Sequence, residues 1–141
     1  MRYLGRKFGL DGKTEEDKVR VDMILENAMD LRNGFSKLCY DPNFEQLKPS
    51  YLQKLETTLT DLSKFLGTRR FFATDSVTFP DFFMYEMLSA HKELAPELIG
   101  KFKNLVDFME RVEKLPKIAS FLKSSRSPKG SNNKMAVFGA A

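Results

Sequence analysis

The chain has 141 residues, one cysteine, one histidine and a formal net charge of +4, a size that suggests one domain with a buried core. One cysteine excludes an internal disulfide and favours a reducing cytoplasm, and one histidine argues against most zinc sites and catalytic dyads, so we expect no metal. No apolar run approaches the ~20 residues of a membrane-spanning helix, and the N-terminus lacks the apolar stretch of a signal peptide, which argues against a membrane partner. The basic residues are scattered along the chain, which argues against a nucleic-acid partner.

Helix signals dominate the sequence and strand-type alternation is nearly absent, so an all-α fold is predicted. Residues 1–10 form a short amphipathic segment that ends at Asp11. Thr14 and Asp17 form a capping box for a long helix that should extend to about Cys39. Its apolar residues recur every three or four positions, which turns one stripe toward a core. They are Val21, Ile24, Ala28, Leu31, Phe35 and Leu38.

Two more helices are expected in the middle of the chain. The first begins at Pro49 and ends before Gly67, a natural C-terminal stop. The second begins at Thr78, where Thr78 and Asp81 form another capping box and Pro80 fits the first turn. Apolar residues occupy nearly every side of this second helix, which indicates a central, buried position.

The last third of the chain should contain helices near 101–114 and 116–124 and then an irregular tail, because Ser, Pro, Gly and Asn dominate residues 124–133. The final apolar segment, residues 135–138, can fold back onto the helices.

The first long helix carries an acidic stripe. Asp22, Glu26 and Asp30 are spaced four apart and line one side. A solvated acidic face explains this spacing, and a stripe of carboxylates also suits incoming ammonium or guanidinium groups. His91 and Cys39 receive structural interpretations: His91 as a partner for the dipole at the end of its helix, and Cys39 as a core residue.

A second set of residues on this helix keeps three- and four-residue spacing and shares another face: Met29, Asn33, Ser36 and Tyr40. Arg32 lies beside this face. The Tyr40 phenol stays protonated near neutral pH and can donate a hydrogen bond to developing negative charge. Its structural alternative is an amphipathic residue at the edge of the core.

Four segments of the chain resemble mu-class cytosolic glutathione transferases. Residues 2–7 resemble the end of the last helix of their thioredoxin-like domain, and residues 38–49 resemble the segment that joins the first two helices of their C-terminal domain. Residues 78–82 resemble the family's N-capping box, and residues 134–139 resemble the mu-class C-terminus. The resemblance covers essentially the whole chain in order. It implies an all-α, multi-helix bundle of the glutathione transferase C-terminal type.

The resemblance also implies a division of the chain. Residues 1–12 would be a residual helix of the missing thioredoxin-like domain plus a linker. Residues 13–124 would be the helical C-terminal domain, and residues 125–141 the C-terminal tail.

The function implied by the resemblance is conjugation of glutathione, as co-substrate and without a cofactor, to small electrophilic xenobiotics by a homodimer. Tyr40 would act in catalysis by donating a hydrogen bond. Asp30 would contact the glutathione of the partner subunit, and Arg2 would pair with Asp22 and Glu26 across the dimer interface. The electrophile pocket would be lined by Met29, Arg32, Asn33, Ser36 and Tyr40.

In the family that the chain resembles, the tyrosine that activates the thiol lies on the thioredoxin-like domain, so we expect no turnover from these 141 residues alone. The alternative function is a non-catalytic helical module for ligand binding or dimerisation. Asn132 and Asn133 precede Lys134 where the family can place an aromatic residue over the pocket, so no aromatic lid is expected there.

Overall fold

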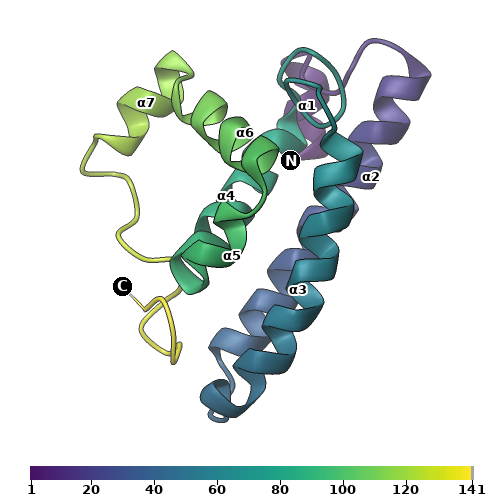
Figure 1. Cartoon of the computed structure of the whole chain (residues 1–141). Coiled ribbons are helices and arrows are strands. Elements are labelled where there is room, and N and C mark those ends of the chain that lie inside the picture. The colour runs from purple at the N-terminus through teal and green to yellow at the C-terminus, as the bar shows by residue number, and fades with distance from the viewer. Residues whose placement is uncertain (141) are drawn as a thin grey trace.

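The computed structural model describes residues 1–140 and, within that range, contains helices and no extended strand. The elements are α1 (Arg2–Lys7), α2 (Glu15–Cys39), α3 (Phe44–Leu66), α4 (Phe79–Leu94), α5 (Pro96–Gly100), α6 (Lys103–Glu113) and α7 (Pro116–Leu122). Helices α2 and α3 form a long pair, and α4 lies against α2 with α5 and α6 beside it (Figure 1). The all-α prediction is confirmed.

Helix α2 has the predicted bounds because its capping box forms. The Thr14 hydroxyl oxygen accepts a hydrogen bond from the Asp17 backbone N–H at 3.1 Å, and the Asp17 carboxylate accepts one from the Thr14 backbone N–H at 3.1 Å. Two of the free N–H groups at the start of the helix are thereby satisfied.

Helix α3 begins at Phe44, not at Pro49 as predicted, and Pro49 lies inside it. This proline lacks the N–H that would bond to the Glu45 carbonyl, and its ring crowds that carbonyl. The Ser50 hydroxyl donates to the nearby Leu47 carbonyl at 2.9 Å. The Phe44 side chain is buried, so core packing at the first turn extends the helix past the proline.

Helix α4 occupies the centre of the fold, as its all-round apolar sequence predicts. Its capping box is buried: the Asp81 carboxylate accepts hydrogen bonds from the Thr78 backbone N–H at 2.7 Å, the Thr78 hydroxyl at 2.8 Å and the Phe72 backbone N–H at 3.0 Å. Burial raises the pKa of Asp81, and these three hydrogen bonds oppose that shift. Asp81 therefore ties the preceding loop to the central helix.

The short helix α1 is attached to the start of α4. The Leu10 carbonyl accepts a hydrogen bond from the Phe79 N–H at 2.8 Å. Gly5 is buried, and a Cβ atom there would lie 2.3 Å from the Phe79 ring. The absence of a side chain at Gly5 thus lets α1 approach α4. That α1 is the remainder of another domain stays a prediction.

The helices near 101–114 and 116–124 are present as α6 and α7 with ends shifted by up to two residues, whereas the sequence signals do not predict α5. Beyond the main core, a second cluster of buried side chains joins the C-terminal end of α2 to the start of α3 and the end of α4. It contains Phe35, Leu38, Cys39, Phe44, Ala90 and Leu94, and Phe138 packs against it. Cys39 is thus a core residue, and the end of the tail folds back through Phe138.

The interpretation of His91 as a partner for the dipole at the end of its helix is wrong, because the ring is buried and neutral. Its Nδ1 lies 2.6 Å from the Met87 carbonyl oxygen and its Nε2 lies 2.6 Å from the Tyr51 hydroxyl oxygen. A carbonyl only accepts, so Nδ1 carries the proton and Nε2 accepts from the Tyr51 hydroxyl. Burial lowers the pKa of His91 and raises that of Tyr51. The neutral ring links α3 to α4.

The buried capping box predicts a large loss of stability on substitution. Asp81→Ala should lower the free energy of unfolding by on the order of 3 kcal/mol, because a cap is lost and the Phe72 and Thr78 donors are left buried without an acceptor. Urea denaturation followed by circular dichroism measures this. Asp17→Ala, the matched change in the exposed capping box of α2, should cost less. An equal loss in the two variants would contradict the role assigned to burial.

The buried neutral ring of His91 predicts weaker folding in mild acid. The pKa is lower in the folded than in the unfolded chain, so the unfolded state binds more protons once the pH falls through about 6.5. The urea midpoint should therefore decrease from pH 7 to about 5.5. His91→Gln removes the only histidine and should flatten this decrease. Parallel decreases in both proteins would show that another group causes the effect.

Candidate functional site

A cavity of about 680 Å³ lies between α2, α4, α7 and the tail. Of the predicted electrophile-site residues, Arg32, Ser36 and Tyr40 line it. Met29 and Asn33 do not line it: Met29 packs against the main core, and Asn33 is exposed. A role for Met29 and Asn33 in substrate binding stays a prediction.

Tyr40 is the C-terminal cap of α2, and its side chain lies at the edge of the cavity. The backbone N–H of Asn133 donates a hydrogen bond to the Tyr40 hydroxyl oxygen at an N–O distance of 3.3 Å. This contact uses the oxygen as an acceptor, so the hydroxyl proton remains available to a molecule in the cavity. Tyr40 is 38% exposed.

The opposite wall of the cavity comes from α4 and includes Tyr85, Glu86, Ser89 and Glu93, which the sequence analysis did not identify. The Tyr85 hydroxyl donates to the Glu113 carboxylate at 3.1 Å, and burial raises the pKa of Tyr85 to about 12. A signal was present in the sequence. Glu86, Ser89 and Glu93 recur at helical spacing in an otherwise apolar helix, a pattern typical of one polar face.

The tail closes one side of this cavity through residues 127–133. Asn132 and Asn133 line it, and the Ser131 hydroxyl donates to the Glu93 carboxylate on α4. The apolar lining comes from the helices: Phe35, Phe82, Met87, Ala90, Ile118, Phe121 and Leu122. Arg32 forms no salt bridge within residues 1–140. The cavity therefore combines an apolar body with a cation and several hydrogen-bonding groups at its edges.

The acidic stripe of α2 is divided between two environments. Arg2 pairs with two of its members inside the same chain: Nε lies 3.1 Å from the Asp22 carboxylate and Nη2 lies 2.6 Å from the Glu26 carboxylate. These two pairs raise the pKa of Arg2. The pairing of Arg2 with Asp22 and Glu26 across a subunit interface stays a prediction.

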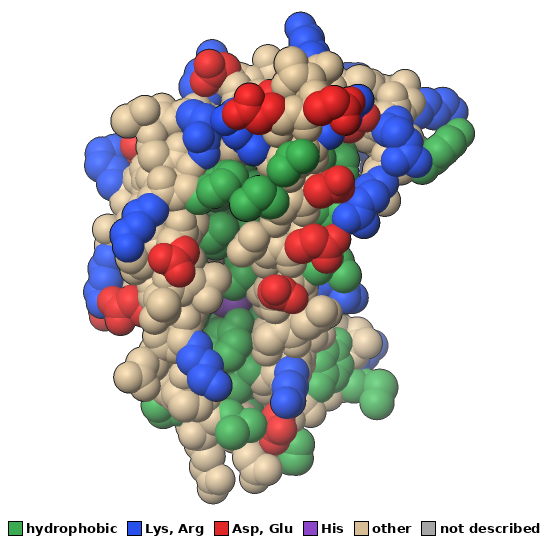
Figure 2. Space-filling model, turned by 90° about the vertical axis from the view of Figure 1, so that its right-hand side faces the viewer, with side chains coloured by type: hydrophobic (Ala, Val, Ile, Leu, Met, Phe, Trp, Pro, Cys, Tyr) green, Lys and Arg blue, Asp and Glu red, His purple; other side chains and the backbone are tan. Residues whose placement is uncertain are grey.

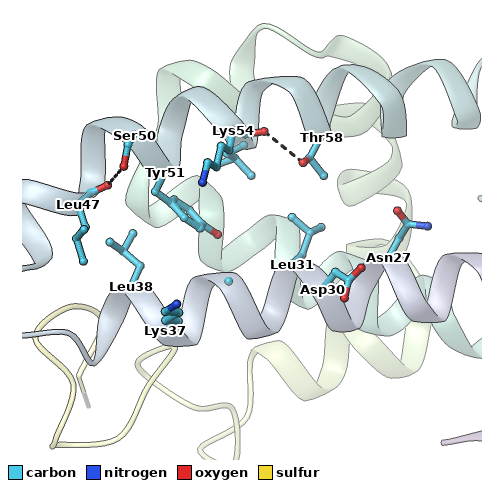
Figure 3. A pocket seen from close by; sticks show the side chains of 12 residues that line it. Asn27, Asp30, Leu31, Lys37, Leu38, Leu47, Ser50, Tyr51, Lys54 and Thr58 are labelled. Carbon is cyan, nitrogen blue, oxygen red and sulfur yellow. Dashed lines mark hydrogen bonds between the residues drawn. The ribbon is translucent and has the colours of Figure 1, made fainter.

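Asp30, the third member of the stripe, borders a separate groove of about 460 Å³ between α2 and α3. Figure 3 shows Asp30 and Asn27 on α2 near one end of this groove, with Tyr51 extending from α3 toward α2. On the face that holds α2 and α3, hydrophobic side chains lie along the middle of the surface, and charged side chains lie on both sides of them (Figure 2). The groove and the cavity share no lining residue.

Within residues 1–140, no group of three His, Cys, Asp or Glu side chains is placed to hold a metal ion. None of the helices in the described part of the chain is both long and apolar enough to cross a bilayer.

Comparison with known proteins identifies the family. Residues 29–125 match the family model for the glutathione S-transferase C-terminal domain. Glutathione S-transferase Mu 4 of Homo sapiens is 45% identical over 138 residues, which cover 97% of this chain and 63% of that protein. Glutathione S-transferase Mu 1 of Macaca fascicularis is 44% identical over 140 residues, which cover 99% of this chain and 64% of that protein.

A solved structure supports the same assignment. The crystal structure of the glutathione S-transferase Blo t 8 superimposes with a TM-score of 0.88 at 27% sequence identity, over 98% of this chain and 67% of that one. The chain thus spans 63–64% of the length of the two curated relatives above. The arrangement of α1 to α7, the match to the family model and the similarity to mu-class proteins together establish that the chain belongs to the glutathione S-transferase C-terminal domain family.

Proposed function

We propose that this chain provides the electrophile cavity and the subunit-contact surface of a mu-class transferase that conjugates glutathione to small electrophiles in a homodimer. The observation that carries the proposal is the Tyr40 hydroxyl at the cavity edge, whose oxygen accepts from Asn133 and whose proton is free for a substrate. The similarity to glutathione S-transferases over nearly the whole chain supports it.

The proposed reaction is attack of the glutathione thiolate on an electrophilic carbon. A carbon–sulfur bond forms, the bond from that carbon to the leaving group or epoxide oxygen breaks, and the bonding electrons move to the departing atom. An epoxide oxygen becomes negatively charged and needs a proton, which the Tyr40 phenol can supply or stabilise through a hydrogen bond. The resemblance assigns thiol activation to the thioredoxin-like domain, so the cavity residues of this chain act on the electrophile.

The mixed lining favours an electrophile with an aromatic body and a polar substituent. Phe35, Phe82 and Phe121 supply apolar surface for the body. Arg32, which forms no salt bridge among residues 1–140, is suited to a nitro, carbonyl or carboxylate group. A purely apolar substrate would make no contact that uses the charge of Arg32.

The position of Asp30 supports a contribution from a second subunit. Asp30 borders the groove between α2 and α3, whereas Tyr40 borders the cavity on the other side of α2. One chain therefore does not present both groups to one glutathione molecule. A carboxylate that contacts the ammonium group of glutathione bound near Tyr40 is better supplied by the partner subunit.

A non-catalytic binding or dimerisation module is the second candidate. The observation that favours it is the apolar surface of α1 and its C-cap, where Tyr3 and Phe8 are each 66% exposed and Leu4 is 54% exposed. Exposed apolar patches of this kind mark contact surfaces. Under this alternative the chain would bind apolar molecules without adding glutathione to them.

Substitution of Tyr40 separates these candidates. The chain can be joined to the N-terminal part of glutathione S-transferase Mu 4, and its kinetics measured with an epoxide and with 1-chloro-2,4-dinitrobenzene. Tyr40→Phe should lower kcat/KM for the epoxide roughly a hundredfold, because the developing alkoxide loses its donor. The chloride leaving group needs no proton, so the second substrate should be affected far less.

The control for this experiment is Tyr85→Phe, which removes the hydroxyl of the other tyrosine that lines the cavity, one that already donates to Glu113. It should leave the ratio between the two substrates unchanged. No turnover by the joined protein would favour the binding module, and equal losses for both substrates in Tyr40→Phe would contradict proton donation by Tyr40.

Substitution of Asp30 tests the glutathione contact. In the same joined protein, Asp30→Asn should raise the KM for glutathione about tenfold, because a charge-assisted hydrogen bond to an ammonium group is lost. The KM for the electrophile should not change. Asp61→Asn, an exposed carboxylate on α3, is the control. An unchanged KM for glutathione in Asp30→Asn would exclude the proposed contact.

A further inference from the structure

We propose that Phe138 is a positioning residue for the cavity: its ring anchors the end of the tail to the core, and the anchored tail sets the wall that a bound electrophile contacts. This inference rests on the proposed function and adds to it a residue that does not line the cavity. Three observations carry it: the packing of the ring, the backbone contacts beside it, and the hydrogen bonds that connect it to the cavity wall.

The ring of Phe138 is packed between aromatic side chains from two helices. It stacks on Phe44 of α3 with a centroid distance of 5.5 Å and an interplanar angle of 6°, and it meets Phe35 of α2 edge-on at 6.4 Å. Both geometries are favourable for aromatic pairs. The other large apolar residues of this segment are exposed, with Met135 at 84% and Val137 at 58%, and Ala136 is small. Phe138 therefore supplies the apolar anchor of residues 135–138.

The backbone beside Phe138 completes the C-terminal end of α2. Carbonyl groups in the last turn of a helix lack partners within the helix. The Cys39 carbonyl, at the last residue of α2, accepts a hydrogen bond from the Val137 N–H at 2.7 Å and a longer one from the Phe138 N–H at 3.4 Å. The ring and the backbone thus attach the tail at the helix end that carries Tyr40.

Asn132 transmits this attachment to the cavity. Its side-chain amide donates to the Phe138 carbonyl at 2.9 Å, and its backbone N–H donates to the Gly139 carbonyl at 2.8 Å. Gly139 has a φ of +69°, a conformation that glycine adopts without strain. The next residue, Asn133, contacts the Tyr40 hydroxyl. Asn132 and Asn133 are wall residues of the cavity, so their positions depend on the anchored segment.

The first test measures the anchoring in the 141-residue chain by amide hydrogen exchange and by trypsin cleavage after Lys134. Phe138→Ala should speed amide exchange at Asn132, Asn133 and Val137, and cleavage after Lys134, by at least about tenfold. Without the ring, local opening of the tail no longer requires a packed side chain to leave its site, so the open state is populated more often. Circular dichroism should show that the helices persist. Val137→Ala, at an exposed neighbour, and Phe138→Tyr, which keeps the ring, should match the original chain. Unchanged exchange in Phe138→Ala would overturn the proposal.

The second test measures the effect on the cavity. The chain is titrated with 1-chloro-2,4-dinitrobenzene without glutathione, and binding is followed by NMR shifts at Ser36 and Tyr40. Phe138→Ala should weaken binding at least about fivefold, because Asn132 and Asn133 are then no longer held in place at the cavity wall. Val137→Ala leaves the anchor intact and should not change the affinity. Faster exchange with unchanged affinity would overturn the positioning role alone. No binding by the original chain at cavity residues would instead count against the proposed function.

Discussion

The fold depends on a carboxylate held entirely inside the protein. Asp81 has no exposed surface, and a buried charge is costly unless hydrogen bonds replace the lost water. Thr78 and the Phe72 backbone supply those bonds from the loop before α4. One side chain thus sets where the central helix begins and how the loop returns to it. Helix α2 packs on α4, so the cavity between them inherits its geometry from this contact.

At the opposite end of α4, neutral polar and aromatic contacts perform a similar task. The His91 ring accepts from Tyr51 of α3 and donates to the Met87 carbonyl within α4. Phe138 from the tail packs against the adjacent second cluster of buried side chains. The two long helices, the central helix and the tail therefore meet at one place, close to the end of α2 where Tyr40 lies. Packing at this place controls the shape of the cavity edge.

The cavity and the groove lie on different sides of α2, and the proposed function assigns a different role to each. Tyr40 and Arg32 line the cavity, which the proposed function assigns to the electrophile, while Asp30 lines the groove on the other side of α2. Substrate chemistry and subunit contact are thus assigned to opposite sides of one helix. Under the proposed function, the residues of the cavity orient an electrophile and stabilise developing charge, and formation of the thiolate is assigned to the domain that the resemblance implies.

Local sequence signals determined the helical class and the N-caps of α2 and α4 at Thr14 and Thr78, because capping boxes and apolar spacing act over a few neighbouring residues. They placed α3 five residues too late, because burial of Phe44 outweighs the hydrogen bond that Pro49 cannot make. The neutral state of His91 and the pairing of Arg2 within the chain required contacts between residues far apart in sequence.

The candidate site shows the same division. Helical spacing was sufficient to group Ser36 and Tyr40 on one face of α2, and Arg32 beside them, since that spacing is a property of the helix itself. The opposite wall from α4 and the tail, the packing of Met29 against the main core, and the particular partners of Phe138 were decided by tertiary structure alone. Each depends on how separate segments pack against one another, and no local pattern encodes the direction in which one helix meets the next.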